Sequence, residues 1–175
     1  MNKMKKSILF VVLAGILCGG CNKNDNHLFE MKYIADFTIQ AGLNPFAGIH
    51  VFEINNIDGN SLAYLSQNGS TAEDISAVNP GVSFMAPIFT DGNYGYIQEI
   101  SIKMYSMSDP SFEKEIFYHD QIQINQSGDL QLIGTLVDVQ DFLWDEEFGI
   151  RVELRLRDFS PETNETRLDF SFFAK

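Results

Sequence analysis

The chain alternates apolar and polar residues over several segments, and this period of two constrains its fold more than any other feature. From residue 29 to residue 39 every second side chain is apolar, and the residues between them are mostly charged or polar. Successive side chains of a β-strand point to opposite faces, so this pattern predicts a strand with one buried face and one wet face. A similar pattern recurs at 97–106, 150–156 and 168–172.

Further segments predict strands in other positions of the sheet or in a hairpin. Residues 49–57 are apolar on both faces, which predicts a central strand. Residues 82–89 read as a strand with Pro87 at an edge or a terminus, because proline cannot donate to a sheet ladder. Segments 115–124 and 130–136 flank a polar turn, and 150–156 and 168–172 flank the loop 158–165. We expect these last two strands to pair with each other as an antiparallel hairpin with one wet face.

Three short segments break the strand pattern. Ser70 and Glu73 form a capping-box pattern, which predicts a short helix that ends before Asn79 and Pro80. Residues 61–67 and 138–146 are the other helical candidates. With no internal repeat, the chain predicts an all-β fold: an antiparallel β-sandwich of about seven to nine strands with one or two short helices, in a single domain over residues 28–175.

The first twenty residues have the composition of a targeting signal. Lys3, Lys5 and Lys6 precede an uncharged apolar run over residues 8–17. A positive region followed by a short apolar core is typical of a secretory signal peptide. The run is shorter than the roughly 20 residues that a membrane-spanning helix needs. Together with the lipobox-like pattern at its end, this composition predicts that residues 1–20 are a lipoprotein signal peptide.

A lipobox-like pattern ends this signal. Gly19 and Gly20 precede Cys21, as small residues precede the acylated cysteine of bacterial lipoproteins, although Cys18 stands where that pattern usually has leucine. We expect Cys21 to be acylated and to anchor the protein in a membrane, with residues 21–27 as the modified cysteine and a short tether. The alternative is cleavage by ordinary signal peptidase near Gly20, which yields a free protein.

The charge balance limits the partners of the mature chain. The full chain has 12 basic and 24 acidic residues, and removal of residues 1–20 leaves nine basic residues and a net charge of −15. This balance argues against a nucleic-acid partner, because phosphate binding needs a basic surface. An anionic bilayer also repels such a domain, so we expect membrane residence to depend on the acyl chains.

One loop has the composition of a ligand-binding site. Asp91, Asn93, Tyr94 and Tyr96 surround glycines in a turn, and exposed tyrosines beside amide and carboxylate groups are typical of glycan-binding loops. The alternative is that both tyrosines pack on the sheet. Trp144 is a similar candidate, as an anchor for a protein partner or as a cap on the core.

An acidic cluster gives a weak metal candidate. On a helix over residues 138–146, Asp138, Asp141 and Asp145 would share one face through their spacing of three and four residues. Clustered carboxylates suit Ca²⁺, but a solvated helix face has the same composition. We expect no resident cofactor.

The sequence resembles an uncharacterised family of small Bacteroidetes lipoproteins. Cys21, the following Asn22-Lys23-Asn24-Asp25, the segment 37–45 and the capped helix before Pro80 carry this resemblance. It implies a single β-rich domain behind a lipobox, located in the cell envelope, and it implies no activity.

Together these features predict a lipid-anchored protein of the outer membrane, facing the periplasm or the cell surface. We expect a non-catalytic module that binds a protein or glycan partner, because the common nucleophile, nucleotide and metallopeptidase motifs are absent from the sequence. Two alternatives remain open: a secreted glycan-active hydrolase that uses a carboxylate pair, and a structural subunit of an outer-membrane complex.

Overall fold

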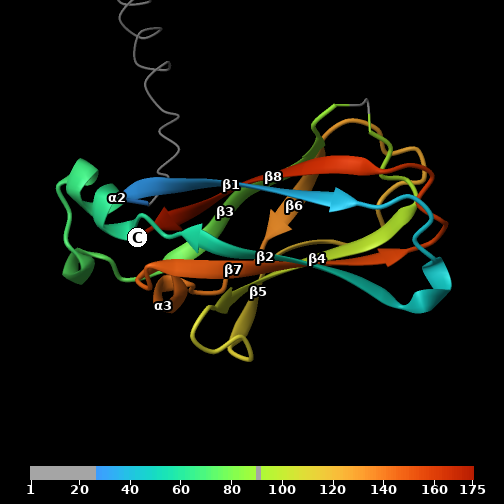
Figure 1. Ribbon diagram of the computed structural model, residues 1–175. Coiled ribbons are helices and arrows are strands. Elements are labelled where there is room, and N and C mark those ends of the chain that lie inside the picture. Colours follow the sequence, from blue (N-terminus) through green and yellow to red (C-terminus); the bar gives the residue numbers. More distant parts are fainter. Residues whose placement is uncertain (1–26, 90–91) are drawn as a thin grey trace, which may run out of the picture.

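The computed structural model describes residues 27–89 and 92–175, and within them the chain is an all-β fold of eight antiparallel strands and two short α-helices (Figure 1). This confirms the predicted fold class. The strands are β1 (Phe29–Ile39), β2 (Ile49–Asp58), β3 (Val78–Pro87), β4 (Ile97–Ser106), β5 (Glu113–His119), β6 (Leu130–Gly134), β7 (Glu147–Leu156) and β8 (Asn164–Ala174). The helices are α2 (Ser61–Asn68) and α3 (Gln140–Leu143), with 3₁₀ turns η1 (Pro45–Ala47) and η2 (Ala72–Asp74).

The strands form one sheet that curls into a nearly closed barrel. Their order is β1-β8-β3-β6-β5-β4-β7-β2, so β6 joins the two layers of the expected sandwich. The two edge strands, β1 and β2, lie next to each other along an open seam. The rings of Phe37 and Phe52 meet across this seam with their centroids 5.4 Å apart. Side chains therefore cover a gap that backbone hydrogen bonds do not close.

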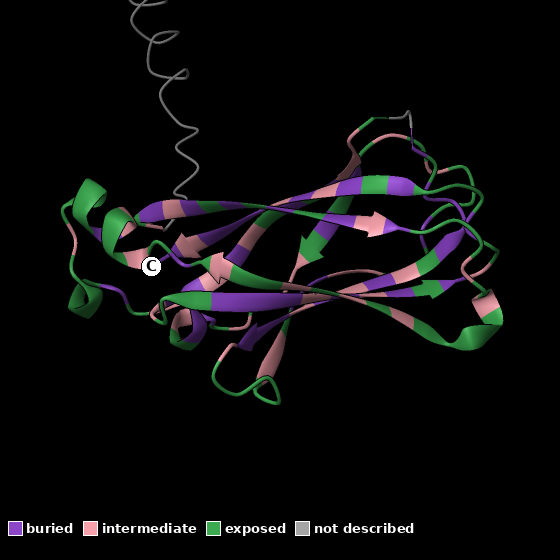
Figure 2. Cartoon of the chain, in the orientation of Figure 1, coloured by how far each residue is buried: buried purple, intermediate pink, exposed green. Residues whose placement is uncertain are grey.

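The alternating residues supply the core as predicted. All six apolar residues of β1 that share one face are buried (Figure 2). Tyr33, in the middle of this face, stacks on Phe170 of β8 at 5.5 Å and meets Phe148 of β7 edge-on at 5.4 Å. Burial of each large apolar side chain contributes roughly 1.5–3 kcal/mol, so the inward faces of both layers stabilise the barrel together.

The predicted C-terminal hairpin is wrong. β7 pairs with β4 and β2, whereas β8 pairs with β1 and β3, so the two strands lie in opposite layers. Alternation shows which face of a strand is buried but does not identify its neighbours. The connection over residues 157–163 is also longer than the two to five residues of an ordinary hairpin loop, and it crosses from one layer to the other.

The predicted positions of two strands within the sheet also need correction. β2 is an edge strand and not a central one, because it pairs with β7 alone among the described strands. Its outward residues Ile49 and Val51 are half exposed, which explains why both of its faces are apolar without being buried. β3 lies between β8 and β6, and Pro87 is its last residue, as the terminal alternative predicted.

The helical segments are shorter than the sequence suggests, except for α2. The capping box forms one residue later than expected: the Thr71 N–H donates to the Asp74 carboxylate at 2.8 Å, and only the 3₁₀ turn Ala72–Asp74 follows. α3 is a single turn. α2, η2 and α3 gather at the end of the barrel where β1 begins, which we call the α2 end (Figure 1).

Among the described residues, no helix has the length and apolar character needed to cross a membrane. The expected signal peptide, Cys21 and most of the tether lie outside the described residues, as does Asp91.

Candidate functional site

The predicted aromatic loop is not an exposed binding surface. Tyr94 is fully buried and Tyr96 is 7% exposed. The Tyr94 hydroxyl donates to Thr166 Oγ1 at 3.4 Å, and Asn93 Oδ1 accepts the Gly95 N–H at 2.7 Å. Both tyrosines therefore pack inside the barrel, which was the alternative prediction, and neither ring face is open to a sugar.

Burial also favours the neutral form of both phenols. It raises the pKa of Tyr94 to about 12, and it raises the pKa of Tyr96 well above its ordinary value. Both phenols are neutral at physiological pH, as an apolar interior requires.

The three metal candidates do not form a joint site. Asp138 Oδ1 accepts the backbone N–H groups of Val78 and Gln140 at 2.9 and 3.0 Å. Asp141 pairs with Lys114 at 3.4 Å, whereas Asp145 follows the end of the single-turn α3. The shared helical face therefore does not exist, and within 27–89 and 92–175 no group of three or more His, Cys, Asp or Glu residues is placed to hold a metal ion.

Trp144 lies far from the aromatic loop, at the α2 end of the barrel. It lines an open groove between α2 and the segment after α3, with a volume of 790 Å³. We call this the α2–α3 groove. It is lined by Asp58, Asn60, Ser61, Leu62, Ala63, Leu65, Ala72, Trp144, Asp145, Glu146 and Glu147.

Local backbone geometry builds this groove. Gly59 follows β2 and approaches the 145–147 segment closely: its N–H donates to the Glu146 carbonyl at 3.0 Å, and a Cβ atom there would lie 3.0 Å from the Asp145 carbonyl oxygen. α2 is held against β1 by the Tyr64 hydroxyl, which donates to the Lys32 carbonyl at 2.8 Å and accepts the Lys32 N–H at 3.0 Å. The groove walls are thus fixed to the barrel at both sides.

The groove combines apolar surface with an acidic rim. Leu62 is 81% exposed, and Trp144 is partly buried against the core. Asp58 and Glu147 stand directly opposite each other in the β2–β7 pairing, and both are exposed. Like charges in this position are unfavourable. Among the described residues, none of the four groove carboxylates, Asp58, Asp145, Glu146 and Glu147, forms an ion pair.

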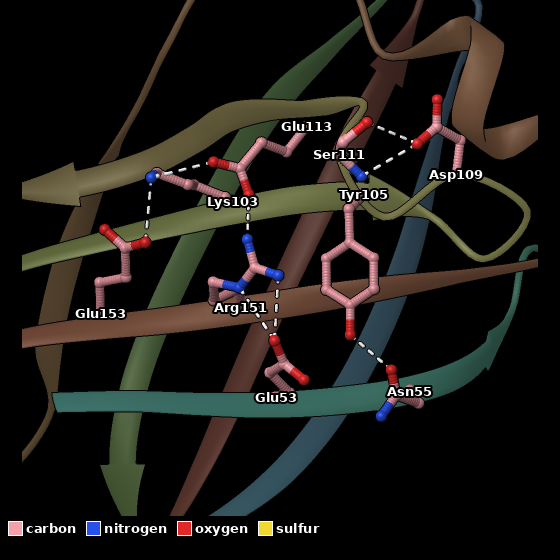
Figure 3. Close-up of polar contacts among 9 residues, drawn as sticks. All are labelled: Glu53, Asn55, Lys103, Tyr105, Asp109, Ser111, Glu113, Arg151 and Glu153. Atoms are coloured by element: carbon pink, nitrogen blue, oxygen red, sulfur yellow. Dashed lines mark hydrogen bonds and ion pairs between the residues drawn. The ribbon is translucent and has the colours of Figure 1, made fainter.

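The outer face of the β2-β7-β4-β5 layer carries charge of a different kind (Figure 3). Arg151 pairs with Glu53 at 2.9 Å and also with Glu113. Lys103 pairs with Glu113 at 3.1 Å and with Glu153 at 2.9 Å. Glu113 therefore lies between two cations that face each other in the β4–β7 register. We call these five residues the sheet-face network.

Hydrogen bonding in this network stabilises the charged forms. The hydrogen bond to Glu153 raises the pKa of Lys103, and the hydrogen bonds to Glu53 raise the pKa of Arg151. Arg151 also lies over the Tyr105 ring, 5.1 Å from its centroid. The charged side chains of the sheet-face network are therefore paired with one another.

A smaller hollow of 270 Å³ lies beside the network, and its carboxylates are largely engaged as well. Glu99 pairs with Arg155 at 3.2 Å, and Glu115 accepts the Ser101 hydroxyl at 2.6 Å. The α2–α3 groove is therefore the larger hollow and the one whose acids lack cationic partners.

The sequence singled out Trp144 as a possible anchor for a partner and Asp145 as a metal candidate, and both line this groove. It did not single out Asp58 or Leu62. The run Asp145-Glu146-Glu147 directly after Trp144 was the available signal, but its proximity to α2 depends on the β2–β7 pairing. No protein-family model matches the chain, and no curated protein matches it significantly.

Proposed function

We propose that the chain is a lipid-anchored cell-envelope protein of the outer membrane, whose domain is a non-catalytic binding module that uses the α2–α3 groove. The observation that carries this proposal is the groove itself, an open hollow with apolar walls and convergent polar groups. Such hollows are the usual form of a binding site.

The position of the groove fits an anchored module. Phe29, where β1 begins at the α2 end, follows Cys21 by eight residues, and such a length of chain reaches at most about 28 Å. Acyl chains on Cys21 would hold the α2 end near the membrane, against the electrostatic repulsion between an acidic domain and anionic lipid. A partner in the groove would then lie close to the membrane surface.

One observation favours the hydrolase alternative. Asp58 and Glu147 form a facing carboxylate pair at the groove rim, and glycoside hydrolysis needs two such groups. Both side chains are exposed to water, however, whereas a general acid needs an apolar site that keeps its proton at neutral pH. The open rim therefore supports binding more than hydrolysis.

Fractionation of cells tests the anchor. We expect Cys21→Ala to move the protein from the membrane fraction to the soluble fraction, while the matched variant Cys18→Ala stays with the membrane. Protease treatment of intact cells then distinguishes surface display from a periplasmic position. A Cys21→Ala protein that stays membrane-bound contradicts the anchor.

Cross-linking in cells tests the groove. A photoreactive amino acid at position 62 should give a cross-linked adduct, whereas the same group at exposed position 162, on the loop before β8, should not. If Asp58→Asn and Glu147→Gln each abolish the release of reducing sugar from a glycan by the purified protein, the hydrolase alternative replaces the binding proposal.

A further inference from the structure

We infer that the α2–α3 groove binds a segment of a partner protein that presents lysine or arginine next to an apolar side chain. This inference rests on the proposed binding function and adds the chemistry of the partner. It follows from the charge of the rim, the exposure of the walls and the position of the chain's own cations.

The acidic rim of the groove would be stabilised by a positive charge, and the described part of the chain places none there. Asp58 and Glu147 face each other across two paired strands, with Asp145 and Glu146 next to them. The groove lining contains no lysine or arginine. Six of the eight described lysines and arginines pair with acids elsewhere, and Arg157 donates to the Ile122 carbonyl; the six are Lys32, Lys103, Lys114, Arg151, Arg155 and Arg167. A cation from a partner would relieve the repulsion between Asp58 and Glu147 and complement the rim.

The exposed apolar side chains of the groove walls would be buried by an apolar group beside that cation. Leu62, on the first turn of α2, is 81% exposed, although it lines a groove whose floor includes the buried Leu65. Figure 2 shows that most of α2 is exposed. A small amine in the groove would leave Leu62 in water, whereas a protein surface would cover it and bury its apolar area. The Trp144 ring can add a cation–π contact with arginine.

Charge argues against two other occupants. A second copy of the mature chain carries the same net charge of −15, and its groove rim would repel the first. An anionic lipid surface is repelled for the same reason. A basic protein segment is the occupant that the groove complements in both charge and apolarity.

The groove contains its own reporter. Trp144 is the only tryptophan among the 175 residues, so intrinsic fluorescence reports directly on the groove. The experiment titrates the full-length protein, in non-ionic detergent at low salt, with a synthetic peptide of alternating arginine and leucine. We expect a saturable change in Trp144 emission that weakens as salt is added. A peptide with glutamate in place of arginine, and one with serine in place of leucine, should each bind at least about tenfold more weakly.

A matched pair of variants ties binding to the rim. The double variant Glu146→Gln and Glu147→Gln should weaken binding of the arginine–leucine peptide roughly tenfold, because two exposed ion pairs are lost. The double variant Glu162→Gln and Glu165→Gln removes two exposed acids at the opposite end of the barrel and should leave the affinity unchanged. Far-ultraviolet circular dichroism verifies that all variants keep the strand content of the parent protein.

Each contrary result overturns the inference. These results are the absence of a saturable change, equal binding of the glutamate–leucine or arginine–serine peptide, and a change that follows protein concentration alone, which indicates a second copy. A response of the Cys21→Ala protein to phosphatidylglycerol vesicles, without peptide or detergent, indicates an anionic lipid surface instead. If the peptides fail but the cross-link at position 62 persists in cells, the proposed binding function stands and only the basic partner is wrong; if both fail, the groove is not a binding site.

Discussion

The sheet-face network and the α2–α3 groove are both rich in carboxylates, but the carboxylates of the network are paired with cations and those of the groove are not. On the sheet face, Glu113 lies between Lys103 and Arg151, and Glu53 and Glu153 complete the set. In the groove, four carboxylates gather without a cation among the described residues, and two of them face each other in register.

The difference separates acids that are paired with cations of the same chain from acids that have no cationic partner among the described residues. Exposed ion pairs stabilise a protein only weakly, so the sheet-face network mainly prevents repulsion on a regular surface. The groove keeps its repulsion, at a small cost in stability. Natural proteins commonly retain such local conflicts at functional sites, which is why the groove and not the sheet face carries our proposal.

The largest expected effect comes from the interior, and it defines the pH range in which the two surfaces can be compared. Burial raises the pKa of Tyr94 to about 12, compared with an ordinary value of 10.0. Its neutral form is thus favoured in the folded state: the stabilisation is complete below pH 10 and is lost as the pH rises to about 12. At about 1.4 kcal/mol per pKa unit, the loss is about 3 kcal/mol.

Urea unfolding at a series of pH values from 8 to 12 measures this loss together with the losses from Tyr33 and Tyr96, whose pKa values burial also raises. Tyrosinate absorbance should appear together with unfolding. Tyr94→Phe is the control, since it should reduce the alkaline loss by the same amount. A free energy of unfolding for the parent protein that stays constant over this range would contradict the burial of the phenol. The two surfaces are best compared near pH 7, well below the range in which the buried tyrosines ionise.

The second prediction breaks the sheet-face network at its centre. Arg151→Met keeps the apolar stem but removes both ion pairs and the contact with the Tyr105 ring, and it leaves Glu53 and Glu113 with fewer partners. We expect the free energy of unfolding in urea to fall by about 1–2 kcal/mol. The matched variant Arg155→Met, whose side chain is 53% exposed, should cost less than about 0.5 kcal/mol. Equal costs would mean that the network acts as separate surface pairs.

The sequence predicted the strands well and their neighbours poorly, for one physical reason. The period of two identified β1 and β4 with their exact bounds, because one buried face determines the alternation. The same pattern could not show that β7 and β8 lie in opposite layers, or that β2 is an edge, because both arrangements bury the same face. Pairing is decided by tertiary packing, which alternation does not record.

The sequence could not predict the candidate sites reliably, because each site depends on burial or on contacts between distant segments. The aromatic loop around Tyr94 had the composition of a binding site, yet Tyr94 and Tyr96 are buried in the core. The Asp138 group required a helix that α3 provides for only one turn. The groove forms where residues near 60 and near 145 meet, a contact that no local pattern in the sequence contains.

The smallest expected effect has the opposite sign, which makes it the sharpest test of the comparison. Glu147→Gln removes the repulsion from Asp58 and should raise the free energy of unfolding by about 0.3 kcal/mol, whereas Glu162→Gln, an exposed acid outside both regions, should leave it unchanged. The gain corresponds to roughly 1 °C in Tm and should vanish in 1 M salt, where screening acts within about 3 Å. A loss of stability in Glu147→Gln would mean that the rim carboxylate already has a stabilising partner within the chain. A gain would mean that the folded protein retains an unfavourable charge at the rim of the α2–α3 groove, as the proposed basic partner requires.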